Sequence, residues 1–421
     1  MSRHQPIRVV KGMRDILPPD SALWGRVEHV AREVFRAYAY QEIRTPIVEV
    51  TELFARGVGQ DTDIVTKEMY TFDDRDGSSL TLRPEATASV VRSYIENRMH
   101  ERPGVKKLFY MGPMFRRERP QKGRYRQFYQ IGAEAIGSES PTVDAEIIEM
   151  LFVMLNRLNL QGASMLVNSV GCAQCRPVFI ERLRNELEKI KDQLCLDCQR
   201  RTVTNPLRVL DCKVPEDQPL IESLPVLSGL LCEGCKQHFD EVQSYLNDRK
   251  IPFVVSPRMV RGLDYYTRTT FEIVHGNLGA QNALLGGGRY DGLSEDLGGP
   301  PAPGIGFSIG EDRFILALGS ADNAESSVDL YIAWMGEAAF RHAAELAREL
   351  RSHNVAVEVA SDPVKLKKSL EIASRLGAPY VLIVGDDEIA QARYALKNLS
   401  NSEQQTVSRE ELFQRFAGPA S

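Results

Sequence analysis

The sequence predicts an α+β fold in which a sheet-based core is interrupted by a cysteine-rich insertion and followed by a smaller α/β unit. Three observations predict it. Residues 107–116 and 128–137 have the pattern of two strands joined by a polar, basic loop. All seven cysteines lie between residues 172 and 235. Beyond residue 328, strands alternate with helices, which is typical of a parallel sheet.

Length and composition set the outer limits of this prediction. A chain of 421 residues corresponds to about two to four domains, and 43% hydrophobic residues are enough to bury real cores. With 52 basic and 57 acidic residues the net charge is −5, so global charge does not indicate a nucleic-acid binder. The region 7–10 is too short for a signal peptide, and no run reaches the roughly 18 apolar residues of a membrane span. We therefore expect a cytoplasmic protein with no membrane partner.

An amphipathic helix is expected near the N-terminus. Asp20 can cap it, and apolar residues recur on one helical face at spacings of three and four. These residues are Leu23, Val27, Val30, Ala31, Val34 and Phe35. Residues 41–45 then look extended, and Pro46 restricts its own position to a strand end, an edge or a turn against another surface.

The other elements complete the expected division of the chain. The core adds a helix at 144–158, a strand at 265–274, and a strand at 304–309 that leads into an amphipathic helix with Ile315, Leu316 and Leu318. The C-terminal unit has expected strands at 328–334, 355–359 and 380–384 and expected helices at 338–353 and 364–376. We thus expect a core of residues 1–170 and 254–319, an insertion of residues 171–253, a linker of residues 320–327 and a C-terminal domain of residues 328–421.

The loop between the first two strands, residues 116–126, is strongly basic. Six basic residues and one acidic residue give it a local charge of +5 in an acidic chain. Such a loop is suited to meeting phosphate groups. A solvated run of charge would have the same composition and stays an alternative.

The strand that follows this loop divides its side chains between two faces. Alternation places Phe128, Gln130, Gly132 and Glu134 on one face and Tyr129, Ile131, Ala133 and Ala135 on the other. We interpret the polar face as the floor of a ligand pocket. A strand with one face in solvent would show the same alternation.

Three further segments carry groups suited to ligand binding. Residues 261–266 (RGLDYY) combine a guanidinium, a carboxylate and two phenols, and arginine recognises carboxylates and phosphates through paired hydrogen bonds; a surface turn is the alternative. Residues 286–292 (GGGRYDG) allow close approach of the backbone to a ligand, although a tight hairpin would use the same glycines. Residues 304–313 (GIGFSIGEDR) lead from strand to helix but lack the dinucleotide and P-loop patterns.

The cysteines form three CxxC pairs and one single residue: Cys172/Cys175, Cys195/Cys198, Cys232/Cys235 and Cys212. In a chain expected to be cytoplasmic, such clustering indicates a metal site before a disulfide framework. Two pairs could supply four thiolates to a structural Zn²⁺, and the grouping stays open. Buried reduced thiols and redox chemistry are the alternatives.

Together these segments resemble the class II aminoacyl-tRNA synthetases and, more narrowly, the histidyl-tRNA synthetase family. The first helix and the strand ending at Pro46 resemble motif 1, residues 115–134 resemble motif 2, and residues 304–313 resemble motif 3. Residues 261–266 and 286–292 resemble the two histidine-specific signature peptides. The resemblance extends from about Gly12 to the C-terminus. It implies an antiparallel-sheet catalytic core and a C-terminal α/β anticodon-binding domain.

The resemblance also implies roles for individual residues. Arg261 and Arg116 would be catalytic. Histidine would be bound by Glu85, Thr87, Arg116, Gln130, Glu134, Arg261, Tyr265 and Tyr266. ATP would be bound by Arg116, Glu118, Phe128 and Arg313, with the arginines on phosphates and Phe128 stacked on adenine.

The implied activity is that of a ligase of protein biosynthesis that uses ATP as substrate with Mg²⁺. Histidine and ATP would give histidyl-adenylate and pyrophosphate, and histidine would then pass to the 3′ end of tRNA(His). Motif 1 implies a homodimer. A catalytically silent paralogue that regulates ATP phosphoribosyltransferase is the first alternative, although it generally lacks the C-terminal domain. Another class II synthetase is the second, and the signature peptides disfavour it.

Overall fold

The computed structural model describes residues 7–60, 62–276, 282–319, 328–363 and 365–417. Its contacts divide the chain into two compact units, Met1–Ala321 and Asp322–Ser421. The expected linker 320–327 and the first residue of the helix expected at 364–376 lie outside the described residues. The cysteine-bearing segment lies within the first unit, and its independence as a domain stays a prediction.

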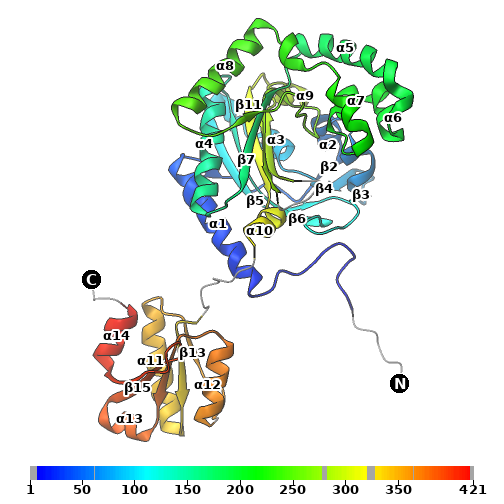
Figure 1. Cartoon of the computed structure of the whole chain (residues 1–421). Helices are drawn as coiled ribbons and strands as arrows, with labels where there is room; N and C mark the ends of the chain where they lie inside the picture. Colours follow the sequence, from blue (N-terminus) through cyan, green and yellow to red (C-terminus); the bar gives the residue numbers. More distant parts are fainter. Residues whose placement is uncertain (1–6, 61, 277–281, 320–327, 364, 418–421) are drawn as a thin grey trace, which may run out of the picture. The chain divides into compact units, whose positions relative to one another are not determined.

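The first unit is built on an eight-stranded sheet with the order β1-β5-β6-β11-β10-β9-β7-β8 (Figure 1). All neighbouring strands from β5 through β6, β11, β10 and β9 to β7 pair antiparallel. The edge strands β1 and β8 pair parallel to their neighbours β5 and β7. The hairpin expected at 107–116 and 128–137 is confirmed, shifted by one residue. The bounds are β1 Gln41–Glu42, β5 Lys106–Phe115, β6 Gln127–Ile136, β7 Ala163–Ser169, β8 Val254–Val255, β9 Thr267–His275, β10 Ala283–Arg289 and β11 Gly304–Gly310.

A small sheet and ten α-helices complete the description of the first unit. The small sheet has the order β2-β4-β3, with β2 Val48–Val50, β3 Tyr70–Asp73 and β4 Ser79–Leu82. The helices are α1 Asp20–Ala37, α2 Thr51–Val58, α3 Thr87–Glu96, α4 Pro141–Arg157, α5 Cys175–Ile190, α6 Leu196–Thr204, α7 Gln218–Glu222, α8 Glu233–Asp248, α9 Leu293–Asp296 and α10 Glu311–Leu318. Over the described residues, no helix combines the length and the apolarity that a membrane crossing requires.

Helix α1 confirms the expected apolar stripe with two corrections. Val27, Ala31, Val34 and Phe35 are buried. Leu23 and Val30 are only partly covered, and Trp24 takes a buried position that the spacing did not predict. The expected capping role of Asp20 is wrong, because the residue before the helix is Pro19 and no side chain caps the N-terminus. Asp20 instead lies in the first turn, where a carboxylate interacts favourably with the helix dipole.

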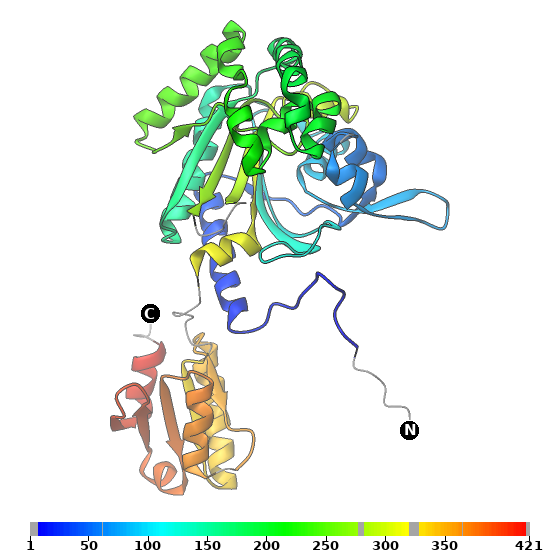
Figure 2. The same cartoon turned by 45° about the vertical axis from the view of Figure 1, so that its right-hand side comes forward.

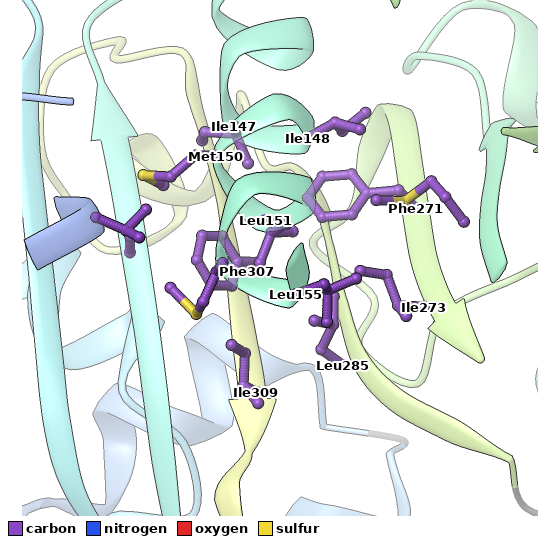
Figure 3. Close-up of a cluster of buried hydrophobic side chains, with 14 of the residues drawn as sticks. Ile147, Ile148, Met150, Leu151, Leu155, Phe271, Ile273, Leu285, Phe307 and Ile309 are labelled. Carbon is purple, nitrogen blue, oxygen red and sulfur yellow. The ribbon is translucent and has the colours of Figure 1, made fainter. Parts of the chain in front are cut away.

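One face of the main sheet is covered by α1, α4 and α8, which share a single apolar cluster with it. Figure 3 shows the residues of α4 in this cluster, Ile147, Ile148, Met150, Leu151 and Leu155, against the sheet residues Phe271, Ile273, Leu285, Phe307 and Ile309. Full burial of each such side chain contributes about 2 kcal/mol. Because this packing covers one face of β6, β10 and β11, only the opposite face of these strands is left to form a ligand-binding site.

The opposite face meets α3, α9 and the part of the insertion that precedes α8. The second apolar cluster joins α3 and α5 to Tyr265, Tyr266 and Tyr290. Figure 2 shows the insertion helices in green, gathered beside the sheet. The cysteine-bearing helices therefore pack against the segment expected to bind ligand.

The C-terminal unit is a five-stranded sheet with the order β13-β12-β14-β15-β16. Its elements are β12 Leu330–Trp334, α11 Glu337–Ser352, β13 Val357–Val359, α12 Leu366–Arg375, β14 Tyr380–Val384, α13 Asp386–Gln391, β15 Arg393–Asn398, β16 Gln404–Ser408 and α14 Arg409–Ala417. The three expected strands pair in parallel, as predicted. The purely parallel sheet is wrong, because β15 and β16 add an antiparallel hairpin whose polar residues hid it from the apolar pattern.

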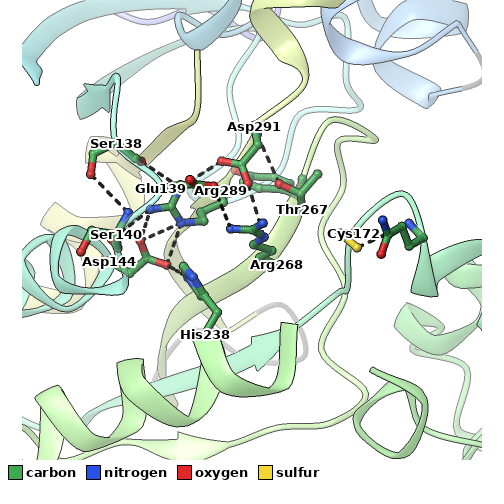
Figure 4. Close-up of polar contacts among 12 residues, drawn as sticks. Ser138, Glu139, Ser140, Asp144, Cys172, His238, Thr267, Arg268, Arg289 and Asp291 are labelled. Carbon is green, nitrogen blue, oxygen red and sulfur yellow. Dashed lines mark hydrogen bonds and ion pairs between the residues drawn. The ribbon is translucent and has the colours of Figure 1, made fainter. Parts of the chain in front are cut away.

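A buried ion network ties the sheet to two helices. Arg289 at the end of β10 and Asp144 of α4 are both 0% exposed, and Arg289 Nε lies 2.8 Å from Asp144 Oδ1. His238 Nε2 of α8 lies 2.8 Å from Asp144 Oδ2 (Figure 4). Arg289 Nη1 also donates to Asp291 Oδ1 at 2.9 Å and to the Ser138 carbonyl at 3.0 Å. The network joins β10, α4 and the insertion helix α8 at one point.

Replacing Arg289 by methionine should lower the free energy of unfolding by about 3–5 kcal/mol, because the buried Asp144 carboxylate would lose its guanidinium partner and keep His238 alone. Urea unfolding should be followed by tryptophan fluorescence in a Trp334→Phe background, so that Trp24 reports on the first unit alone.

The control is Arg268→Met. Arg268 forms partly exposed ion pairs with Glu139 and Asp291 at 3.8 Å, so this variant should lose less than about 1 kcal/mol of the free energy of unfolding. The double variant Arg289→Met/Asp144→Leu should recover part of the lost stability. An Arg289→Met protein as stable as the control would contradict the prediction.

Candidate active site

The candidate active site lies on the sheet face opposite α4. On β6, the side chains of Ile131, Ala133 and Ala135 belong to the core beneath α4. Gln130 and Glu134 take the other face and are 6% and 0% exposed. The expected alternation is confirmed, and the alternative of a solvent-facing strand is wrong because other elements of the chain cover the polar face.

Glu134 is a fully enclosed polar group of this face. Thr87 Oγ1 donates to Glu134 Oε1 at 2.7 Å, and the Tyr290 hydroxyl donates to Oε2 at 2.6 Å. Burial raises the pKa of Glu134 from 4.5 to about 8. No role for Tyr290 was predicted, although its phenol within the glycine-rich string 286–292 was the available signal.

Two glycines make room for the charged groups. Gly306 pairs with Glu134 across β6 and β11, and a Cβ at Gly306 would lie 1.6 Å from Glu134 Oε2. A Cβ at Gly286 would lie 2.0 Å from Arg261 Nη2. Because Gly286 lies inside β10, the tight-hairpin alternative is wrong. The group that approaches this glycine is a side chain of the chain itself.

The N-terminus of α3 holds Glu85. Its carboxylate accepts hydrogen bonds from the backbone N–H groups of Thr87 at 2.7 Å and Ala88 at 2.9 Å. These donors are among those that a helix N-terminus leaves without intrahelical partners. Burial raises the pKa of Glu85, and these bonds oppose the rise. The arrangement places Glu85 and the Thr87–Glu134 pair side by side.

Arg116 links this region to the basic loop. Its Nε donates to the Pro84 carbonyl at 2.9 Å, next to Glu85, and its guanidinium lies 5.2 Å from the centre of the Phe128 ring. Arg116 Nη1 lies 3.8 Å from Glu118 Oε1, and Arg124 pairs with Glu118 Oε2 at 2.8 Å. Arg116, Glu118 and Phe128 therefore form one contact group, as the proposed ATP site requires.

Arg261 lies over Gly286. Its Nη1 is 3.4 Å from Glu272 Oε1, and its guanidinium lies 6.0 Å from the centre of the Tyr266 ring. Arg261 Nε is buried and has no hydrogen-bond partner among the described residues. The chain does turn at Asp264 and Tyr265, and Asp264 is exposed. The rings of Tyr265 and Tyr266, however, lie 4.8 Å apart and are buried, so the segment is not a plain surface turn.

The predicted residues surround two adjoining cavities. A pocket of about 390 Å³ is lined by five arginines, Arg116, Arg124, Arg208, Arg261 and Arg313, together with Glu118 and Phe128. A narrower cavity is lined by Glu85, Thr87, Arg116, Gln130, Tyr265, Tyr266 and Tyr290. Arg116 lines both. Of the residues predicted for histidine and ATP, all but Glu134 line one of the two cavities. Glu134 lies behind Thr87 and Tyr290, which donate hydrogen bonds to it and line the narrower cavity. The arrangement can hold a phosphate-bearing ligand beside a small polar group.

Electrostatics support an anion in the larger pocket. Burial lowers the pKa of Arg313, and the neighbouring charge of Arg124 lowers it further. A bound phosphate would relieve the repulsion between these two guanidinium groups. The basic loop thus reaches the pocket through Arg124 and is not only a solvated run of charge.

The cysteines gather into two separate groups. Cys172, Cys175, Cys232 and Cys235 form the first. Cys195, Cys198 and Cys212 form the second together with Asp217, which the CxxC spacing could not reveal. Within each group the potential ligand atoms all lie within 4.8 Å of one another. Both groups could hold a metal ion.

Comparison with known protein families agrees with this geometry. A family model described as histidyl-tRNA synthetase matches residues 12–313. The chain belongs to the histidyl-tRNA synthetase family. A second model, described as an anticodon binding domain, matches residues 329–418. The expected resemblance and the expected class II fold, with a cysteine-bearing insertion and a C-terminal α/β domain, are confirmed.

Individual members of the histidyl-tRNA synthetase family match almost the whole chain. The histidine–tRNA ligase of Solibacter usitatus is 62% identical over 97% of this chain and 99% of that protein. The histidine–tRNA ligase of Koribacter versatilis is 55% identical over 96% of this chain and 95% of that protein. The solved apo structure of Staphylococcus aureus histidyl-tRNA synthetase is 39% identical, with a TM-score of 0.80 over 98% of this chain and 100% of that chain.

The pKa of Glu134 predicts a pH dependence of stability. Because its folded-state pKa of about 8 lies above 4.5, the folded chain keeps a proton that the unfolded chain releases. As the pH rises from 4.5 to 8, the free energy of unfolding should therefore fall relative to that of a Glu134→Gln variant, by at most about 1.4 kcal/mol per pH unit. Urea unfolding of both proteins across this range measures it. Glu295→Gln, at an exposed position, should follow the wild type; a constant difference between wild type and Glu134→Gln would refute the assignment.

Proposed function

We propose that the chain is a histidine–tRNA ligase. It activates histidine with ATP to histidyl-adenylate and pyrophosphate, then transfers histidine to the 3′ end of tRNA(His) with release of AMP. The observation that carries the proposal is the arginine-lined pocket that adjoins a polar, aromatic cavity beside the buried Glu134. The names of the relatives that match the whole chain support it.

ATP occupies the larger pocket in this proposal. Arg116 and Arg313 bind its phosphates, which must be neutralised before a carboxylate can attack. Adenine stacks on Phe128, and Glu118 lies near the adenine amino group. ATP is anionic at its phosphates and carries a flat ring at its other end. The contact between Arg116 and Phe128 supports this arrangement, because it places a cation for the phosphates and a ring for adenine in one pocket. Mg²⁺ would accompany ATP and neutralise phosphate charge, and the carboxylate of Glu272, which lines the pocket, is of the ligand type that Mg²⁺ takes.

Histidine occupies the narrower cavity. Glu85 and Thr87 hold its α-ammonium, and Gln130, Glu134, Tyr265 and Tyr266 hold its imidazole. A neutral imidazole offers one donor and one acceptor. With a pKa of about 8, Glu134 can donate or accept a hydrogen bond near neutral pH. An amino acid that lacks these groups would leave buried polar atoms unpaired, which supports selectivity for histidine.

Arg261 acts at the junction of the two substrates. It contacts the α-phosphate and the histidine carboxylate, and it stabilises the charge that develops as the carboxylate oxygen attacks phosphorus and pyrophosphate leaves. Its buried, unpartnered Nε supports this role, because an enclosed donor without a partner is available to a ligand. Arg116, which lines both cavities, assists from the other side.

tRNA contacts both units in this proposal. The acceptor end meets the basic loop 116–126, of which Arg124 and Tyr125 line the ATP pocket. The C-terminal unit, which matches an anticodon binding domain, contacts the anticodon. The negative net charge of the chain does not oppose RNA binding, because local patches decide contacts. We place the enzyme in the cytoplasm, and we propose that the cysteines of residues 171–253 bind structural Zn²⁺.

No observation favours the regulatory alternative. Residues 329–418 match an anticodon binding domain, and Arg116, Arg261 and Arg313 are all present around one pocket. A solved structure described as an ATP phosphoribosyltransferase regulatory subunit/histidyl-tRNA synthetase is 21% identical with a TM-score of 0.67, which shows a shared fold alone. A synthetase for another amino acid is disfavoured by the family match.

Replacing Arg261 by alanine should abolish most of the histidine-dependent exchange between ATP and pyrophosphate, because the transition-state charge loses its donor. A loss of about 100-fold or more is expected. Histidine binding, measured by calorimetry, should persist. Exchange at the wild-type rate would remove Arg261 from the mechanism.

Gly286→Ala serves as a second test of Arg261, because the added Cβ would displace the guanidinium without removing it. Gly292→Ala is its matched control, since a Cβ there meets no atom within 4 Å. Gly286→Ala should lose exchange activity and Gly292→Ala should keep it. Equal activities would show that the guanidinium position does not matter.

A homodimer forms through the segment after Pro46 in this proposal. Ile47, Val48, Val50 and Phe72 are 42%, 40%, 53% and 45% exposed, and β2 is an edge of the small sheet. Apolar side chains on an edge strand favour pairing with another chain. Ile47, Val48 and Val50 directly follow the segment that resembles motif 1, and Phe72 lies on β3 of the same small sheet. Their position supports a second copy of this chain as the partner.

Light scattering should give the mass of two chains of 47.2 kDa. Val50→Glu should reduce it to one chain, because a carboxylate in the interface is desolvated without a partner. Val178→Glu, at an exposed position of α5, is the control and should leave the mass unchanged. A wild-type mass of one chain would contradict the homodimer.

A further inference from the structure

The first cysteine group has the dimensions of a metal site. Cys172 Sγ lies 3.9 Å from Cys175 Sγ and 3.7 Å from Cys232 Sγ. A tetrahedral Zn²⁺ with Zn–S bonds of about 2.3 Å separates its sulfurs by about 3.8 Å, whereas a disulfide joins them at about 2.05 Å. Gly171, with a φ of +67°, would clash with Cys175 Sγ at 2.7 Å if it carried a Cβ. The backbone is thus shaped around the sulfurs.

The second group has three sulfurs and one carboxylate. Cys195 Sγ lies 3.9 Å from Cys212 Sγ, and Cys212 Sγ lies 3.3 Å from Asp217 Oδ2. Asp217 also accepts a hydrogen bond from the Cys195 backbone N–H at 3.0 Å. Its carboxylate is 1% exposed, and no ion pair joins it to a basic side chain of the described residues. A buried carboxylate without a cation is unfavourable, and a divalent ion bound with the three thiolates would compensate it.

Each group anchors helix starts. In the first, Cys175 begins α5 and Cys232 directly precedes α8. In the second, Cys195 directly precedes α6. No side-chain cap is present at any of these three helices. Because thiolates are stabilised at helix N-termini, a metal bound there would fix the helices in place of a cap.

Next to each group an arginine grips the segment that carries Arg261. Arg176, which follows Cys175, donates to the carbonyls of Val170 at 3.1 Å, Asp264 at 3.5 Å and Tyr266. Arg208, in the short helical turn Pro206–Asp211 that precedes Cys212, donates to the Gly262 carbonyl at 3.1 Å. Arg176 and Arg208 therefore hold three of the carbonyls between Arg261 and Tyr266.

We propose that residues 171–253 hold two Zn²⁺ centres, one with four cysteines and one with Cys195, Cys198, Cys212 and Asp217. The centres position Arg176 and Arg208, and through them the backbone of residues 261–266. Arg176 is a positioning residue, because it lines neither cavity and holds the carbonyls beside Arg261. Arg208 holds the Gly262 carbonyl and also lines the larger pocket. The existence of the centres is independent of the proposed function, whereas the positioning role rests on it.

Metal content tests the centres. Elemental analysis of the purified full chain should give about two zinc ions per chain in the wild type and about one in Cys235→Ala and in Asp217→Ala. Glu216→Gln, at the exposed neighbouring position, is the control and should keep two. One zinc ion or less in the wild type would overturn the pair of centres, and two in Asp217→Ala would overturn Asp217 as a ligand.

X-ray absorption at the zinc edge keeps the test valid if Asp217→Ala fails to fold. The wild type should show about 3.5 sulfur ligands per zinc, the mean of four and three, and Asp217→Cys should show about four. A value that stays at about 3.5 in Asp217→Cys would exclude position 217 from the coordination.

Exchange kinetics test the positioning role. Arg176→Gln and Arg208→Gln should retain two zinc ions but lower kcat of ATP–pyrophosphate exchange about tenfold, because a charge-assisted hydrogen bond is lost. Arg176→Lys should recover part of the rate. Arg184→Gln, at an exposed position of α5, is the control. Wild-type rates in both variants, or in zinc-depleted enzyme, would overturn the role. Absence of exchange in the wild type would instead refute the proposed function and leave the zinc count unaffected.

Discussion

The buried pair of Arg289 and Asp144 is the interaction on which the rest of the first unit depends. It joins β10 to α4, and His238 extends it to α8. A charge at 0% exposure is tolerated only with a partner, so these three elements cannot shift independently. Strand β10 also carries Gly286, over which Arg261 lies. Tyr290, the residue after Arg289, donates a hydrogen bond to Glu134. One ion pair thus connects the core, the insertion and both halves of the candidate site.

Close packing across glycines explains how so many charged groups share one face. The strands β6, β10 and β11 carry glycines where neighbouring side chains cross them, and Glu134 and Arg261 lie in the space so created. The enclosure has an electrostatic consequence, because burial raises the pKa of Glu134 to about 8 and leaves Arg261 Nε without a partner. A site of this kind is prepared to receive hydrogen bonds and charge from a ligand.

The sequence predictions succeeded where a local pattern of residues marks the structure and failed where no such pattern is present. Periodicity located the β5–β6 hairpin within one residue, because strong alternation and a basic loop mark it clearly. It missed the β15–β16 hairpin, whose polar residues carry little apolar pattern. The cap assigned to Asp20 was wrong because Pro19 takes that position. Tyr290 was missed because its partner Glu134 lies far away in sequence. Asp217 was missed because it is a carboxylate outside the CxxC spacing, although Cys212 is near it in sequence.

By itself, the sequence determined the family, the strands that carry the predicted site and the residue types available for binding and catalysis. These follow from local spacing and from resemblance, which need no three-dimensional information. Only the tertiary structure decided the pairing of Thr87 and Tyr290 with Glu134, the approach of Arg261 to Gly286 and the division of the cysteines into two groups. The physical reason is that burial, pKa and ligand grouping depend on contacts between distant segments, and no spacing along the chain encodes them.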